Sequence, residues 1–289
     1  MKIHKAKKSL GQNFLKSEIA LKKIIEAGEV GGEDIILEIG PGKGALTEKL
    51  LEKSKKVIAV EKDFELISFL KEKFSEQIKS GTLVLTQGDI LEFEASAYGL
   101  EPKAYKIIAN IPYNITGAIL KKFLTANPPA GGQPERMVLL VQHEVATRII
   151  ARDGKESILS ISVKAYGEPK IIMKVGARYF SPAPKVDSAV ILINNISRRL
   201  FLNSPLEEYP KGEVENSSTP SRKRATPQEG NLEEKFWEIV KTGFAHKRKK
   251  LSSNLKSLSK NINSASLESL GNKRAEDLSL EDWISLSKA

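Results

Sequence analysis

The sequence predicts an α/β protein with a Rossmann-like, mostly parallel sheet of seven strands, followed by a small all-α domain. Seven short runs of aliphatic residues between residues 35 and 193 have the length of strands, and amphipathic helical patterns separate the first five. These strands are apolar throughout, which is typical of a parallel sheet that is covered on both faces. Beyond residue 230 only helical patterns remain.

The strands are expected, in order, at residues 35–39, 57–60, 83–86, 106–109, 137–141, 171–175 and 189–193. Helical spacing of apolar residues places one helix around Leu66 and Leu70 and another around Val145 and Ile149. No helical pattern separates the last two strands, so they are expected to form an antiparallel hairpin at the edge of the sheet. Residues 157–165 alternate like a strand, but we favour a helix there.

The domain organisation follows from a change in composition. Residues 1–196 are expected to form the catalytic domain. Residues 203–230 contain four of the 13 prolines and few aliphatic residues, so burial cannot offset their ordering entropy and we expect a flexible linker or insertion. Residues 231–289 are expected to form the helical domain. Its apolar patterns predict three helices, marked by Leu232, Phe236 and Val240, by Leu251, Leu255 and Leu258, and by a capping box that starts at Ser279.

Charge and composition restrict the function classes. Lys and Arg total 46 against 36 Asp and Glu, a net charge of +10 that favours a polyanionic partner. The absence of cysteine excludes thiol catalysis, disulfides and Cys-based zinc sites, and the three histidines are too far apart in sequence for a metal site. Neither a signal peptide nor a membrane-length apolar run of about 20 residues is present, so we expect a cytoplasmic protein without a metal.

A glycine-rich turn, Gly40-Pro41-Gly42-Lys43-Gly44, follows the first expected strand and opens a helix. Glycine lets the backbone approach a ligand closely, and free N–H groups at a helix start favour an anionic group. Glu61 ends the second strand and Asp89 follows the third. Gly40, Gly42 and Ala45 also satisfy the dinucleotide-binding pattern, so an oxidoreductase stays an alternative, although no hydride-transfer partner is apparent.

Together, these residues resemble the class I S-adenosylmethionine methyltransferases. The resemblance implies that the turn from Gly40 to Gly44 runs beside the methionine part of the cofactor. It implies further that Glu61 binds the ribose hydroxyls and that Asp89 binds the adenine amino group.

The motif Asn110-Ile111-Pro112-Tyr113 follows the fourth strand, at the sheet edge where α/β proteins bind ligands. Methylating an adenine amine requires turning its nitrogen towards tetrahedral geometry, because its lone pair is delocalised into the ring. The side-chain carbonyl of Asn110 and the backbone carbonyl of Ile111 are two acceptors suited to this task. Pro112 stiffens the turn, and Tyr113 offers a ring on which an extruded base can stack.

Further motifs resemble those of the KsgA-type ribosomal RNA adenine dimethyltransferases. They lie at residues 9–15, 110–115, 141–146 and 179–188, and the likeness covers nearly the whole chain apart from residues 203–230. It implies that Asn13 and Leu15 close over the cofactor and that Phe180 stacks on the base opposite Tyr113. His143 departs from the family, which usually has lysine at this position.

Two basic clusters suit a nucleic-acid backbone. One is formed by Lys2, Lys5, Lys7 and Lys8. The other is formed by Lys247, Arg248, Lys249 and Lys250, expected at the start of the helix that contains Leu251. The family resemblance implies that the helical tail recognises structured ribosomal RNA.

The resulting hypothesis is a monomeric enzyme that uses S-adenosylmethionine to dimethylate two adjacent adenines near the 3′ end of small-subunit ribosomal RNA. By resemblance, its partner is the immature small ribosomal subunit. Two alternatives stay open: an Erm-type enzyme that modifies large-subunit RNA, and a ribosome-assembly factor that binds RNA without catalysis. The intact Asn110, Tyr113 and Phe180 argue against the second, and the Leu10-Gly11-Gln12 start argues against the first.

Overall fold

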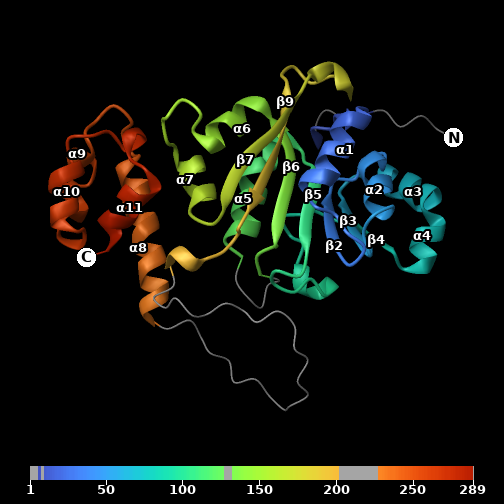
Figure 1. Cartoon of the computed structure of the whole chain (residues 1–289), viewed down its shortest axis with the longest axis horizontal. Coiled ribbons are helices and arrows are strands. Elements are labelled where there is room, and N and C mark those ends of the chain that lie inside the picture. Colours follow the sequence, from blue (N-terminus) through green and yellow to red (C-terminus); the bar gives the residue numbers. More distant parts are fainter. Residues whose placement is uncertain (1–5, 8–9, 127–131, 202–226, 289) are drawn as a thin grey trace, which may run out of the picture. The chain divides into compact units, whose positions relative to one another are not determined.

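A computed structural model describes residues 6–7, 10–126, 132–201 and 227–288, with side chains of the last segment described from residue 232. The chain divides into two compact units (Figure 1). The N-terminal unit comprises residues 1–152 and 162–197, and the C-terminal unit comprises residues 153–161 and 198–289. Residues 153–161, assigned to the catalytic domain from sequence, join the C-terminal unit because Lys155 pairs with Asp277 and the Glu156 N–H donates to the Glu276 carbonyl.

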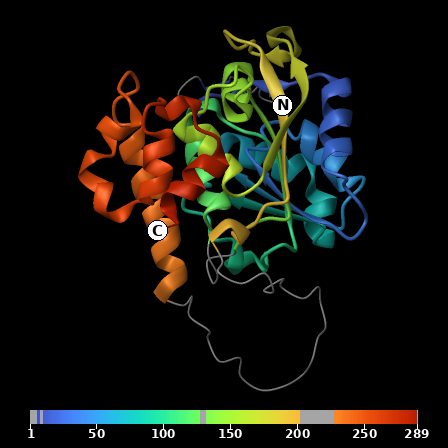
Figure 2. The ribbon, with the colours of Figure 1, turned by 60° about the vertical axis from the view of Figure 1, so that its left-hand side comes forward.

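The N-terminal unit is built on a seven-stranded sheet with the order β4-β3-β2-β5-β6-β9-β7. Its strands are β2 Ile35–Ile39, β3 Lys56–Glu61, β4 Leu83–Gln87, β5 Lys106–Asn110, β6 Arg136–Gln142, β7 Glu168–Val175 and β9 Ser188–Asn194. The first five are parallel, and β9 runs antiparallel to both β6 and β7. The predicted sheet and its antiparallel hairpin are confirmed (Figure 2, yellow to orange strands).

Helices precede, connect and follow the parallel strands. They are α1 Glu18–Ala27, α2 Ala45–Leu51, α3 Phe64–Lys73, α4 Ser75–Ser80, α5 Thr116–Leu124, α6 His143–Ile150 and α7 Ile158–Lys164, with 3₁₀ turns at Ala95–Tyr98, Tyr113–Ile115 and Ala177–Tyr179. The helix predicted around residues 157–165 is therefore confirmed. Apolar residues of α1, α2 and α3 share one buried cluster with Ile36, Val57 and Ile108 of the sheet. This packing fixes the carboxyl ends of β2, β3, β4 and β5 at one edge, where ligands of α/β proteins bind.

A second, two-stranded sheet was not predicted. β1 Phe14–Leu15 pairs antiparallel with β8 Phe180–Ser181, with Leu15 opposite Phe180. This small sheet joins the segment before α1 to the connection between β7 and β9. These two segments lie more than a hundred residues apart in the sequence.

The C-terminal unit contains α8 Pro227–Gly243, α9 Leu251–Asn254, α10 Ser264–Leu270 and α11 Leu280–Ser287, with 3₁₀ turns at Arg199–Phe201, Lys256–Asn261 and Ala275–Asp277. The predicted capping box is confirmed, because Ser279 and Asp282 exchange hydrogen bonds of 3.2 and 3.1 Å. The prediction of one helix through Leu251, Leu255 and Leu258 is wrong. Its α-helical part ends at Asn254, whose side-chain amide donates to the carbonyls of Gly243 and His246 instead.

Of the expected linker at residues 203–230, residues 203–226 lie outside the described part of the chain. The last part of the expected linker is helical, since α8 begins at Pro227. Proline suits the first position of a helix, where its missing N–H has no partner to lose. Over the described ranges, no helix has both the length and the apolar character needed to span a membrane.

Candidate active site

A cavity of about 560 Å³ lies at the carboxyl ends of β2, β3 and β5. Its lining comes from the N-terminal segment before α1, the glycine-rich turn and the loops after the neighbouring strands. The structure places there these sequence-predicted residues: Asn13, Leu15, Gly40, Gly42, Glu61, Asp89, Asn110, Ile111, Pro112 and Tyr113. Segments almost a hundred residues apart thus contribute to one site.

The glycine-rich turn brings backbone against the N-terminal segment. Gly42 has a φ of +60°, and a Cβ at this position would lie 2.9 Å from the Phe14 ring. Its N–H donates a 3.2 Å hydrogen bond to Oε2 of Glu61. Only glycine allows both this positive φ and this close approach to Phe14 without strain. The N–H hydrogen bond to Glu61 then holds the turn to β3 at the cavity wall.

Glu61 is buried at the end of β3, and its carboxylate is oriented by backbone groups. Oε1 accepts a 2.9 Å hydrogen bond from the Asp63 N–H, while Oε2 accepts from Gly42. Burial raises the pKa of Glu61, and these N–H donors partly oppose that effect. A carboxylate has about four acceptor sites, so Glu61 can still accept hydrogen bonds from a ligand's hydroxyl groups.

Asp89 presents a second carboxylate to the cavity. Its Oδ2 pairs with the Lys62 ammonium at 2.8 Å, and its Oδ1 accepts from the Leu91 N–H at 2.9 Å. The Lys62 hydrogen bond lowers the pKa of Asp89, and the Leu91 N–H acts in the same direction. The side chain is therefore ionised at neutral pH, as an acceptor for an amino group should be.

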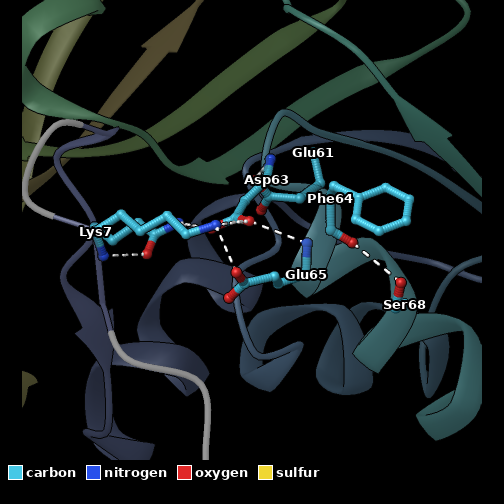
Figure 3. Close-up of polar contacts among 7 residues, drawn as sticks. Lys7, Glu61, Asp63, Phe64, Glu65 and Ser68 are labelled. Atoms are coloured by element: carbon cyan, nitrogen blue, oxygen red, sulfur yellow. Dashed lines mark hydrogen bonds and ion pairs between the residues drawn. The ribbon is translucent and has the colours of Figure 1, made fainter.

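Asp63, which the sequence analysis did not single out, anchors the N-terminal segment (Figure 3). Its carboxylate accepts hydrogen bonds of 2.7 Å from both the Lys7 ammonium and the Gln12 amide, and one of 3.1 Å from the Glu65 N–H. Burial opposes ionisation, but the Lys7 and Gln12 hydrogen bonds outweigh it and lower the pKa of Asp63. The position of Asp63 before α3 signals a helix cap; nothing in sequence signals a partner 56 residues away.

Glu38 is a second residue whose role the sequence analysis missed. It is 1% exposed, lines the cavity, and its Oε2 has no hydrogen-bond partner among the described residues. Burial raises the pKa of Glu38 to about 8, and the nearby charge of Glu61 acts in the same direction. A buried acceptor without a partner is costly, so a donor or a cation from a ligand is the natural occupant of the space beside it.

The Asn110 motif forms the other end of the cavity. The Asn110 side-chain amide donates a 3.0 Å hydrogen bond to the Asn13 carbonyl, which leaves its oxygen as the acceptor that it offers a ligand. Tyr113 is held by a 2.5 Å hydrogen bond between its hydroxyl and that of Ser188, and burial raises the pKa of Tyr113. The N-terminal segment therefore orients Asn110, a dependence that the spacing of the motif does not reveal.

The expected position of Phe180 is corrected by the structure. Its ring is 2% exposed and belongs to the apolar cluster that contains Leu15 and Val175, whereas the neighbouring Ser181 lines the cavity. The pairing of Leu15 with Phe180 in the small sheet turns the ring into the core. In this conformation Phe180 packs in the core and does not line the cavity.

The basic residues behave differently in the two clusters. Lys247, Arg248, Lys249 and Lys250 are exposed in the turn between α8 and α9, rather than at the start of a helix. Lys7 is occupied by Asp63, which corrects its expected role in RNA contact; Lys2, Lys5 and Lys8 lie outside the described residues. Within the described ranges, no three His, Asp or Glu side chains gather as a metal site.

Known proteins are similar to this chain over nearly its whole length. The chain is 36% identical over 288 residues to the Ribosomal RNA small subunit methyltransferase A of Dehalococcoides mccartyi (strain CBDB1), covering 98% of this chain and 87% of the relative. It is 37% identical to the protein of the same name from Acaryochloris marina (strain MBIC 11017), covering 97% and 96% of the two chains.

Two solved structures share the fold. A dimethyladenosine transferase from Plasmodium falciparum aligns with a TM-score of 0.70 and 26% identity, covering 94% of this chain and 95% of that one. The 23S rRNA methyltransferase ErmE aligns with a TM-score of 0.69 and 24% identity, covering 96% and 98%. These matches confirm the predicted class I methyltransferase fold. The family model for "Ribosomal RNA adenine dimethylase" matches residues 3–211, and the chain belongs to this family.

Proposed function

We propose that this protein transfers methyl groups from S-adenosylmethionine to the exocyclic amines of two adjacent adenines near the 3′ end of small-subunit ribosomal RNA. The observation that carries the proposal is the hydrogen bond of Asn110 to the Asn13 carbonyl, because it fixes an amide in the same cavity as Glu61 and Asp89. The names of the relatives at 36% and 37% identity favour the small subunit.

The cavity fits S-adenosylmethionine, which supplies a methyl group activated by a positively charged sulfur. The partnerless buried oxygen of Glu38 suits a cationic ammonium beside the glycine-rich turn. The oriented carboxylate of Glu61 suits the ribose hydroxyls, and the ionised Asp89 suits the adenine amine. Each pairing joins an acceptor of this chain to a donor of the cofactor.

The Asn110 end of the cavity suits the target amine. The Asn110 amide oxygen and the Ile111 carbonyl each accept a hydrogen bond from the target amine. These two hydrogen bonds turn the nitrogen lone pair out of conjugation with the ring. Stacking of the extruded adenine on the Tyr113 ring adds about 1–3 kcal/mol, by the magnitude found for single-strand binders. No strong general base is required, since the amine loses its proton after attack.

The same geometry serves a large-subunit methyltransferase, and RNA binding by the exposed cluster Lys247–Lys250 alone would serve an assembly factor. The proposed partner is the immature small ribosomal subunit, and the protein is proposed to bind it as a monomer in the cytoplasm. The exposed cluster is expected to contact RNA backbone, with an affinity that falls steeply as salt rises.

The deciding experiment is labelled methyl transfer to undermodified small and large ribosomal subunits, followed by mass spectrometry of the nucleosides. We expect dimethyladenosine in small-subunit RNA only. Label in the large subunit would favour the Erm-type function. Binding of small subunits without any methyl transfer would favour the assembly factor, and either result would overturn the proposal.

A further inference from the structure

A second hollow of about 590 Å³ lies on the N-terminal unit, and no role has been given to it so far. We call it the Tyr179 groove; the lining residues that matter here are Ile19, Met173, Lys174, Arg178, Tyr179 and Asp187. Ile19 is 71% exposed and Tyr179 is 39% exposed. Clustered apolar side chains that stay open to water commonly mark a binding surface.

The Tyr179 groove adjoins the reaction cavity. The Lys16 N–H donates a 2.8 Å hydrogen bond to the Tyr179 carbonyl, and both Lys16 and Ser181 line the cavity. Tyr179 and Ser181 flank the buried Phe180, so about 7 Å of extended chain separates them. This is a suitable distance for neighbouring nucleotides of one strand to occupy the two hollows.

The charge of the groove suits a nucleotide. The Arg178 guanidinium lies 5.0 Å from the centre of the Tyr179 ring and donates to its hydroxyl at 3.2 Å. Among the described residues, no carboxylate lies within ion-pair distance of Arg178. The acidic Asp187 pairs with the Lys174 ammonium at 2.9 Å and accepts a 3.0 Å hydrogen bond from the Ala177 N–H. A guanidinium that forms no ion pair with a carboxylate of the described residues, beside an exposed ring, offers contacts to both a phosphate and a base.

We propose that the Tyr179 groove holds the nucleotide next to the adenine in the reaction cavity. Its base stacks against Tyr179 and Ile19, and its phosphate meets Arg178. The inference rests on the proposed function, in which two adjacent adenines are modified. While one adenine occupies the cavity beside Tyr113, its neighbour is drawn out of the RNA stack and needs a surface of its own.

The kinetic test uses Tyr179→Ala, with undermodified small subunits as the varied substrate. Loss of a stacked base predicts a rise in KM of about 5- to 150-fold, the equivalent of ~1–3 kcal/mol per base. We expect kcat and the affinity for S-adenosylmethionine to be unchanged, and Tyr179→Phe to raise KM much less than Tyr179→Ala, because it keeps the ring and loses only the hydroxyl that accepts from Arg178. Phe64→Ala removes a ring that is 65% exposed and lines neither hollow, and it is the matched control.

Arg178→Gln tests the phosphate contact separately. It should raise KM and reduce the slope of log affinity against log salt by about one charge. A KM equal to that of wild type for both Tyr179→Ala and Arg178→Gln would overturn the inference.

A test on the RNA distinguishes the neighbouring base from other contacts and needs no protein variant. Small subunits are reconstituted with an abasic nucleotide beside the remaining target adenine. The KM of wild-type protein for these abasic subunits should be higher than for normal subunits, by the same factor by which Tyr179→Ala raises KM for normal subunits. The KM of Tyr179→Ala should not rise further on abasic subunits. If Tyr179→Ala raised KM relative to wild type by the same factor on normal and on abasic subunits, the groove would contact something other than the neighbouring base. Absence of methylation of normal subunits by wild-type protein would instead sink the proposed function.

Discussion

The two ends of the reaction cavity are built on different principles. At the cofactor end, Glu61 and Asp89 are carboxylates, and each is oriented by at least one backbone N–H. At the amine end, Asn110 and Tyr113 are neutral, and each is held by one side-chain hydrogen bond. The comparison indicates that the binding end is preorganised by backbone N–H groups of the loops that follow β2, β3 and β4, whereas the reactive end depends on the N-terminal segment and on the Ser188 side chain of β9.

The largest effect is expected at the amine end. Asn110→Ala should lower kcat by about 10²–10³, by analogy with the removal of one fixed polar group at a reacting centre. Affinity for RNA should not change, because Asn110 contributes little area. Turnover and subunit binding measured on the same preparation check this, with Asn261→Ala as the control, since Asn261 is an exposed amide outside the cavity. An equal loss in binding would contradict the assignment.

At the cofactor end, the affinity for S-adenosylmethionine should depend on pH through Glu38, whose pKa is about 8. A cationic cofactor favours the ionised form and releases its proton, so affinity should rise with pH below 8, by at most about tenfold per pH unit. Calorimetric titration at pH 6 and pH 8 measures this. The Glu38→Gln variant should show no such change; a slope that survives in Glu38→Gln would assign the proton elsewhere.

Folding stability should respond to Glu38 in the opposite sense. Because its pKa is higher in the folded state than in the unfolded state, its contribution is full below pH ~4.5 and is lost as pH rises towards 8. Comparing the thermal unfolding of wild type and Glu38→Gln across this range isolates the contribution. Parallel curves would show that Glu38 does not titrate there.

The link between the two ends is the N-terminal segment, held to Asp63 by Lys7 and Gln12. Lys7→Met removes the charge-assisted hydrogen bond to Asp63, but solvent screens this interaction because the lysine side chain is 37% exposed, so we expect only a small loss of stability. We expect kcat to fall by up to about tenfold, because Asn13 fixes Asn110 less firmly when Gln12 alone holds the segment to Asp63. Lys7→Arg should restore turnover. A loss of thermal stability with kcat intact would show that the pair is merely structural.

How far the sequence predicts this molecule depends on the range of the interactions. The strands and the placement of Glu61, Asp89 and Asn110 follow from local periodicity and from the rule that parallel strands end at one edge. Contacts between distant segments were missed: Lys7 with Asp63, and Tyr113 with Ser188. Phe180 was misplaced for the same reason, because a two-residue strand pairing decides which way its ring points. A motif names the residue types, but tertiary contacts orient them.

The variant with the smallest expected effect tests whether the amine end needs the Tyr113 hydroxyl or only the Tyr113 ring. Tyr113→Phe keeps the stacking surface and removes the hydrogen bond to Ser188, a change of about 0.5–1.5 kcal/mol. We expect kcat/KM for small subunits to fall by only about two- to tenfold, and Tyr113→Ala to fall further because it loses the ring as well. If Tyr113→Phe were as impaired as Tyr113→Ala, the hydroxyl rather than the ring would hold the reactive end together. The neutral end would then depend on fixed polar contacts as strictly as the carboxylate end does.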